Sequence, residues 1–153
     1  MTTLWRISNY PDLSGEGGRI ASARWHTGGR PVVYLAESPA AAMLERIVHL
    51  LNPGGKLPRT YDLLEVEAGE NLVISNLDPP IESQWKYDVG ITRLLGDGWL
   101  AAAASALARV PSVVVPRTSN FLLNPLHPDA SQVRIASVIR ERFDNRLFQS
   151  GGR

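Results

Sequence analysis

Short stretches in which apolar and polar positions alternate predict that much of the chain forms β-strands. These stretches are rich in β-branched residues and are bounded by glycine, proline and small polar residues, a pattern typical of strands. The expected strands are Leu4–Ser8, Pro31–Ala36, Thr60–Val66, Asn71–Ile74, Val113–Val115 and Gln132–Ile139. Between the first two, the glycine-rich segment from Asn9 to Gly18 predicts a loop.

The clearest helical spacing of apolar residues follows Ser38. Ser38 can cap the helix and Pro39 can occupy its first position, where a missing N–H is harmless. The apolar stripe of this helix consists of Met43, Leu44, Ile47, Val48 and Leu51. The turn residues Asn52-Pro53-Gly54-Gly55 are expected to end it.

A second helical pattern covers residues 88–108, but Gly96-Asp97-Gly98 interrupts it. Two helices are therefore predicted, with Asp97 capping the second, which runs through Leu100–Leu107. Strands and helices alternate without the regular period of a doubly wound sheet. The expected fold class is α+β, a single mixed α/β domain.

Composition narrows the class of protein. The 153 residues are 44% hydrophobic and 20% charged, as in one globular domain. Sixteen basic and fifteen acidic residues leave a net charge of +1, which argues against direct binding of nucleic acid over a broad basic face. There is no cysteine and the three histidines lie far apart, so no metal site is expected.

The N-terminal residues lack a basic-then-apolar signal segment, and the longest apolar stretch, Trp99–Leu107, is too short to span a membrane. We therefore expect a cytoplasmic protein that does not contact a membrane.

Three residues could each take part in catalysis or ligand binding, and each also has a purely structural explanation. Glu45 flanks the apolar stripe of its helix, so its carboxylate needs a partner; the structural alternative is a rim glutamate bonded to Arg46 or to a neighbouring loop. Arg24 could hold a phosphate bidentately or form an ordinary ion pair. The hydroxyl of Tyr34, in an apolar strand, needs a partner or an open cleft.

The polar segment 116–128 follows a predicted strand and contains Ser119 and Asn120. Hydroxyl and amide groups at a strand end are typical of ligand-binding loops, although a hydrogen-bonded turn would look the same. No Gly-x-Ser-x-Gly surrounds Ser119, which argues against a serine hydrolase. The glycines of residues 14–18 match neither dinucleotide nor Walker patterns.

Taken in order, these segments resemble the RES-domain family, named for an arginine, a glutamate and a serine. The matching segments are Leu4–Ser8, Ser22–His26, Pro31–Ser38, Ala42–His49, Val115–Pro128 and Asp144–Leu147. One departure is Ala23, where the family usually has glycine. The resemblance implies a RES domain over residues 1–148, and the sequence Ser150-Gly151-Gly152 predicts a mobile tail at 149–153.

RES proteins are toxins of bacterial toxin–antitoxin systems with a fold similar to ADP-ribosyltransferases. The resemblance implies that NAD⁺ is the substrate, that no metal is needed, and that a helix-turn-helix (Xre-like) antitoxin covers the active site. The family's arginine falls on Arg24, its glutamate on Glu45, its serine on Ser119 and its tyrosine on Tyr34.

These residue types suit cleavage of the nicotinamide–ribose bond, which passes through an oxocarbenium-like state. Glu45 would stabilise the positive charge, Arg24 would hold the pyrophosphate, and Tyr34 would pack against nicotinamide. Ser119 would orient the ligand or Glu45. Arg6 and Asn120 are further candidates for contacts with NAD⁺.

Several alternatives stay open at this point. The ADP-ribose could pass to water, to phosphate or to a target protein. A non-catalytic module that binds a nucleotide or a protein would keep the same pocket, and a DNA-binding protein is disfavoured by the charge balance.

Overall fold

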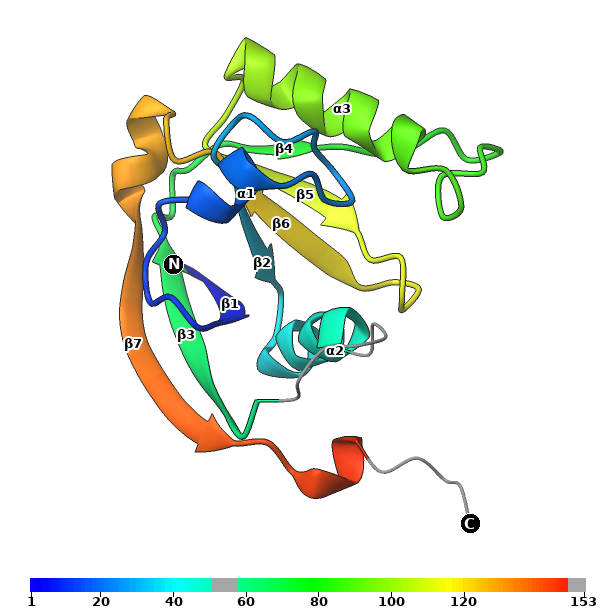
Figure 1. The fold of residues 1–153 in the computed structure, drawn as a ribbon. Coiled ribbons are helices and arrows are strands. Elements are labelled where there is room, and N and C mark those ends of the chain that lie inside the picture. Colours follow the sequence, from blue (N-terminus) through cyan, green and yellow to red (C-terminus); the bar gives the residue numbers. More distant parts are fainter. Residues whose placement is uncertain (51–57, 149–153) are drawn as a thin grey trace.

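A computed structural model of the protein describes residues 1–50 and 58–148 (Figure 1). Its strands are β1 (Thr2–Ser8), β2 (Val33–Ala36), β3 (Thr60–Ala68), β4 (Ile74–Asn76), β5 (Leu107–Pro111), β6 (Ser119–Leu123) and β7 (Val133–Arg142). The α-helices are α1 (Glu16–Ile20), α2 (Pro39–Leu50) and α3 (Val89–Ala102). Two 3₁₀ turns follow, η1 (Pro128–Gln132) and η2 (Asn145–Leu147). The predicted mixed α+β class is confirmed.

The described strands form one sheet in the order β4-β5-β6-β2-β1-β3-β7. Neighbours are antiparallel except β4 and β5, which are parallel. The strand β1 pairs with β3 along its whole length, but with β2 only through Trp5 and Ala36. The two halves of the sheet therefore separate next to this single pair, as the divergence of β1 and β2 in Figure 1 shows.

Apolar side chains cover both faces of the sheet. On one face the central strands contribute a cluster that includes Leu4, Leu35, Leu64, Phe121 and Leu123. On the other, α3 packs through Trp99 and Leu100 onto Ala108, Val110 and Leu122. Adjacent residues of β6 thus point to opposite faces, as the pleat of a strand requires. This alternation decides which polar residues of β6 can reach the site.

Helix α2 begins where the sequence predicts. The hydroxyl of Ser38 accepts a hydrogen bond from the N–H of Ala41, 3.0 Å away, so Ser38 caps the helix and Pro39 is its first residue. The predicted stop at residues 52–55 lies outside the described residues, as does the predicted tail at 149–153.

Helix α3 continues through Gly96-Asp97-Gly98, so the prediction of two helices was wrong. A Cβ atom at Gly96 would overlap the carbonyl oxygen of Trp25, and glycine therefore allows close packing here rather than a break. Asp97 does not cap a helix; its carboxylate accepts from the N–H (2.8 Å) and the hydroxyl (2.7 Å) of Thr27. The start of the helix is capped by Asp88, which accepts from the N–H of Gly90.

The helix ends at Ala102, before the predicted end at Leu107, which instead opens β5. The predicted strand Val113–Val115 was also wrong. These residues form a bend in which Val114 and Val115 are exposed, because the hydroxyl of Ser112 accepts from the N–H groups of both. The strand predicted at Asn71–Ile74 is displaced as well, because β4 begins only at Ile74.

The predicted loop before β2 contains the short helix α1. Gly15 makes the preceding turn with φ +71°, a conformation that other residues rarely adopt. A Cβ at Gly18 would lie 2.6 Å from Cγ1 of Val32, so this glycine allows α1 to pack closely on the chain entering β2. Within residues 1–50 and 58–148, no helix is long and apolar enough to cross a membrane.

Candidate active site

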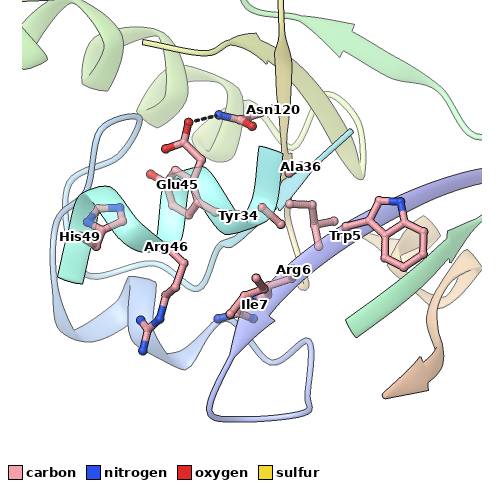
Figure 2. Close-up of a pocket in the computed structure, with 11 residues that line it drawn as sticks. Trp5, Arg6, Ile7, Tyr34, Ala36, Glu45, Arg46, His49 and Asn120 are labelled. Atoms are coloured by element: carbon pink, nitrogen blue, oxygen red, sulfur yellow. Dashed lines mark hydrogen bonds between the residues drawn. The ribbon is translucent and has the colours of Figure 1, made fainter. Parts of the chain in front are cut away.

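A pocket opens where β1 and β2 separate (Figure 2). Three consecutive residues of each strand line it, and α2 and β6 complete its walls. The lining residues are Trp5, Arg6, Ile7, Tyr34, Leu35, Ala36, Ala42, Glu45, Arg46, His49 and Asn120. Four of the residues predicted for the site, Arg6, Tyr34, Glu45 and Asn120, are brought together here.

Helix α2 presents one face to this pocket. Ala42, Glu45, Arg46 and His49 are spaced at i, i+3, i+4 and i+7, which places them on the same side of a helix. The buried Ala42 brings the helix close to the strands, and the larger polar residues line the opening. Glu45 is thus part of the pocket wall, as its position beside the apolar stripe indicates.

Two hydrogen bonds hold the carboxylate of Glu45, and both reach the same oxygen. Oε1 accepts from Nδ2 of Asn120 at 3.0 Å and from the hydroxyl of Ser112 at 3.2 Å. Among the described residues, no donor bonds Oε2 of Glu45. One oxygen therefore fixes the carboxylate, while the other is available to a ligand.

Ser112 is buried, and its hydroxyl is fully used. The N–H groups of Val114 and Val115 donate to its oxygen at 3.1 and 3.2 Å. With these two donors on the oxygen, the hydroxyl proton is directed at Glu45. Ser112 was not among the predicted residues. The available signal was a serine at the end of an apolar strand, but the strand was expected at 113–115 rather than at Leu107–Pro111.

Asn120 lies in β6 between Ala36 of β2 and Val110 of β5. Its amide nitrogen faces the Glu45 carboxylate, and the reverse orientation would place two oxygens together. Its Oδ1 is buried and has no hydrogen-bond partner among the described residues. Asn120 therefore supports Glu45 with its nitrogen and keeps an acceptor unused.

The hydroxyl of Tyr34 is hydrogen-bonded to residues that do not line the pocket. It accepts from the N–H of Trp25 at 3.1 Å and lies 2.7 Å from Nδ1 of His26, whose Nε2 is 2.9 Å from the carbonyl of Gly18. Because a carbonyl only accepts, Nε2 carries the proton of this buried histidine, and Tyr34 donates to Nδ1. Burial raises the pKa of Tyr34 well above its usual value. The ring, rather than the hydroxyl, is what Tyr34 offers a ligand.

Arg6 and Arg46 supply positive charge to the pocket. Nη1 of Arg6 donates to the main-chain oxygen of Asp12 at 3.4 Å. Burial lowers the pKa of Arg6; the charge of Asp12 raises it and that of Arg46 lowers it further. Arg46 was not among the predicted site residues; it was expected only as a possible bonding partner of Glu45.

The structure does not bring Arg24 into the lining of this pocket. Its Nη1 donates to the carbonyl of Lys86 at 3.4 Å, and its own carbonyl accepts from the hydroxyl of Thr92 in α3. Arg24 nevertheless precedes Trp25, whose N–H donates to the hydroxyl of Tyr34, so its main chain lies near that residue.

Ser119 does not line the pocket either. It is the first residue of β6, and strand alternation turns it to the face opposite Asn120. The roles expected for Arg24 and Ser119 stay predictions. In the part of the chain that the structure describes, no group of three or more His, Cys, Asp or Glu residues could hold a metal ion.

Comparison with known proteins agrees with the resemblance found in the sequence. The model of the RES domain family matches residues 3–145. A "Toxin Res" of Pseudomonas putida is 44% identical over 145 residues, which are 95% of this chain and 99% of that one. A "Prs ADP-ribosylating toxin" of a Sphingobium species is 36% identical over 161 residues, covering 97% and 98% of the two chains.

A solved structure shares the fold. It is the M. tuberculosis MbcT–MbcA toxin–antitoxin complex, one chain of which superimposes with a TM-score of 0.75 at 20% identity, covering 91% of this chain and 83% of that chain. The match to the family model and the two relatives extend over nearly the whole sequence. The chain therefore belongs to the RES domain family, together with proteins named as toxins.

Proposed function

We propose that this RES-family protein is a toxin that consumes NAD⁺ by breaking its nicotinamide–ribose bond. One observation carries the proposal: the Glu45 carboxylate is held through one oxygen at the wall of an open pocket. A relative named as an ADP-ribosylating toxin agrees with it, because ADP-ribosylation uses the same bond of NAD⁺.

The chemistry follows from that carboxylate. When the bond between C1′ of the ribose and the nicotinamide nitrogen breaks, the electron pair leaves with nicotinamide and the ribose becomes oxocarbenium-like. Oε2 of Glu45 would stabilise this charge and accept from a ribose hydroxyl. Water, phosphate or a protein side chain then attacks C1′ and loses its proton to solvent.

Other residues would position the substrate and Glu45. The Tyr34 ring, held by its bound hydroxyl, would pack against nicotinamide. Ser112 and Asn120 would orient Glu45, one of the roles that the family resemblance implies for Ser119. Arg24 would contact the ligand from outside the lining of the pocket, next to Trp25, which is bonded to Tyr34.

The proposal includes a partner. A helix-turn-helix antitoxin that covers the pocket would block NAD⁺ and keep the toxin harmless in the bacterial cytoplasm. The structurally similar M. tuberculosis protein was solved in a toxin–antitoxin complex, which favours this arrangement. Expression of the wild-type chain should arrest bacterial growth, and expression of the Glu45→Gln variant should not.

The direct test is to incubate purified protein with NAD⁺ and follow the products by mass spectrometry. Parallel reactions contain buffer alone, inorganic phosphate or a cell lysate, and Glu45→Gln is the control. Free ADP-ribose, phosphorylated ADP-ribose or a modified lysate protein would identify the acceptor. NAD⁺ that is bound but remains intact in every reaction would contradict the proposal and favour the non-catalytic binding module.

A further inference from the structure

Two arginines from different elements face the same side of the pocket. Arg6 comes from β1 and Arg46 from α2, and both line the opening. Figure 2 shows their side chains extending to one side of the pocket, while Glu45 points the other way, toward Asn120. The two guanidinium groups are close enough for the charge of Arg46 to lower the pKa of Arg6.

Nothing in the described chain neutralises Arg46. Among residues 1–50 and 58–148, it forms neither an ion pair nor a side-chain hydrogen bond. In the described residues, Arg6 donates to the main-chain oxygen of Asp12 and has the carboxylate of that residue nearby as a counter-charge, which Arg46 lacks. Two cations beside one pocket repel each other unless an anion joins them.

Glu45 is not that anion. Neighbouring residues of a helix do not face each other, and Oε1 of Glu45 is already bonded to Ser112 and Asn120. The ion pair between Glu45 and Arg46 that the sequence allowed is therefore not formed. A bound anion would therefore supply the counter-charge that Arg46 lacks among the described residues.

We propose that Arg46, together with Arg6, forms a site for a phosphate group in the pocket. A guanidinium donates two parallel N–H groups that match two phosphate oxygens, and it keeps its charge in a half-buried position. The inference deepens the proposed function: with nicotinamide and its ribose at Tyr34 and Glu45, the diphosphate of the same molecule would lie along Arg6 and Arg46. Arg24 would then not be its main anchor.

The same chemistry would also hold free phosphate, so the ligands of the test separate the two sources. Binding is measured by calorimetry in the Glu45→Gln background, which is expected not to arrest growth of the bacteria that express it. The ligands are ADP-ribose, inorganic phosphate and adenosine, and the variants are Arg46→Gln and Arg46→Lys. Arg134→Gln removes an equal charge from β7, where Arg134 pairs with Glu67 outside the pocket, and is the matched control.

Arg46→Gln should weaken ADP-ribose about ten- to a hundredfold, because a charge-assisted contact is lost. Arg46→Lys should recover part of the affinity, while adenosine binding and the Arg134→Gln control should be unchanged. Weakened inorganic phosphate with unchanged ADP-ribose would identify free phosphate as the occupant. Equal affinities of Arg46→Gln and its parent for both phosphate ligands would overturn the proposal.

These measurements do not depend on catalysis. If the wild-type protein failed to consume NAD⁺ but Arg46→Gln still weakened ADP-ribose, the proposed function would fail and the phosphate site would stand. If NAD⁺ were consumed and Arg46→Gln left the affinity for both phosphate ligands unaltered, only the phosphate site would fail.

Discussion

The hydroxyl of Ser112 donates to Oε1 of Glu45 across 3.2 Å, which ties the bend after β5 to the pocket face of α2. The bond joins residues 67 positions apart in the chain. Two main-chain N–H groups fix the serine oxygen from the other side, so its proton has one direction. The carboxylate is thus oriented before any ligand arrives.

Ser112→Ala should therefore lower the turnover number for NAD⁺ by about tenfold, with a smaller change in KM. The variant removes one of two donors from Glu45 and the acceptor of the Val114 and Val115 N–H groups, while every residue that lines the pocket is kept. Steady-state kinetics of nicotinamide release measure the effect, and Ser112→Thr, which keeps a hydroxyl, should retain more activity. Ser119→Ala is the comparison: a larger loss of turnover there than at Ser112 would favour Ser119 as the orienting residue, as the family resemblance implies.

The Glu45→Gln variant removes the negative charge of the side chain but keeps its size and shape. The amide oxygen of glutamine can still accept from Ser112 and Asn120, so the side chain should keep its place. Turnover should fall about a hundredfold or more, because the positive charge of the transition state loses its counter-charge. Affinity for ADP-ribose, measured by calorimetry, should change only a few-fold. A large loss of affinity without loss of turnover would make Glu45 a binding residue.

Elements with local signals could be predicted from the sequence. The cap at Ser38 and the apolar stripe after it define α2 without reference to the rest of the chain. The continuity of α3 could not be predicted, because Gly96 is needed for a contact with Trp25, 71 positions earlier in the chain. Gly96 looks like a helix break in the sequence, but in the tertiary structure it lets α3 pack closely on Trp25.

The site was predictable to a similar extent. Tyr34 stands out as a polar group in an otherwise apolar strand and Glu45 as a carboxylate beside the apolar stripe of its helix, and both line the pocket. Arg46 and Ser112 could not be selected, because their roles depend on the separation of β1 from β2 and on where β5 ends. A strand misplaced by a few residues was enough to hide Ser112.

Tyr34→Phe should affect stability more than chemistry. The variant leaves Nδ1 of His26 and the N–H of Trp25 without their partner, which should lower the free energy of unfolding by about 1–3 kcal/mol. The ring stays against the pocket, so KM for NAD⁺ should change no more than a few-fold. Urea denaturation and steady-state kinetics measure the two effects. Lost turnover at unchanged stability would show that the hydroxyl takes part in the reaction.

Two glycines of α3 give opposite predictions for the same substitution. Gly96→Ala forces a methyl group onto the carbonyl oxygen of Trp25 and should lower the free energy of unfolding by about 1–3 kcal/mol or more. Gly98→Ala meets no atom within 4 Å and should raise it by about 0.5–1 kcal/mol, because alanine favours a helix. Thermal and urea unfolding of both variants test the pair. Stabilisation by Gly96→Ala would mean that α3 does not pack directly on Trp25.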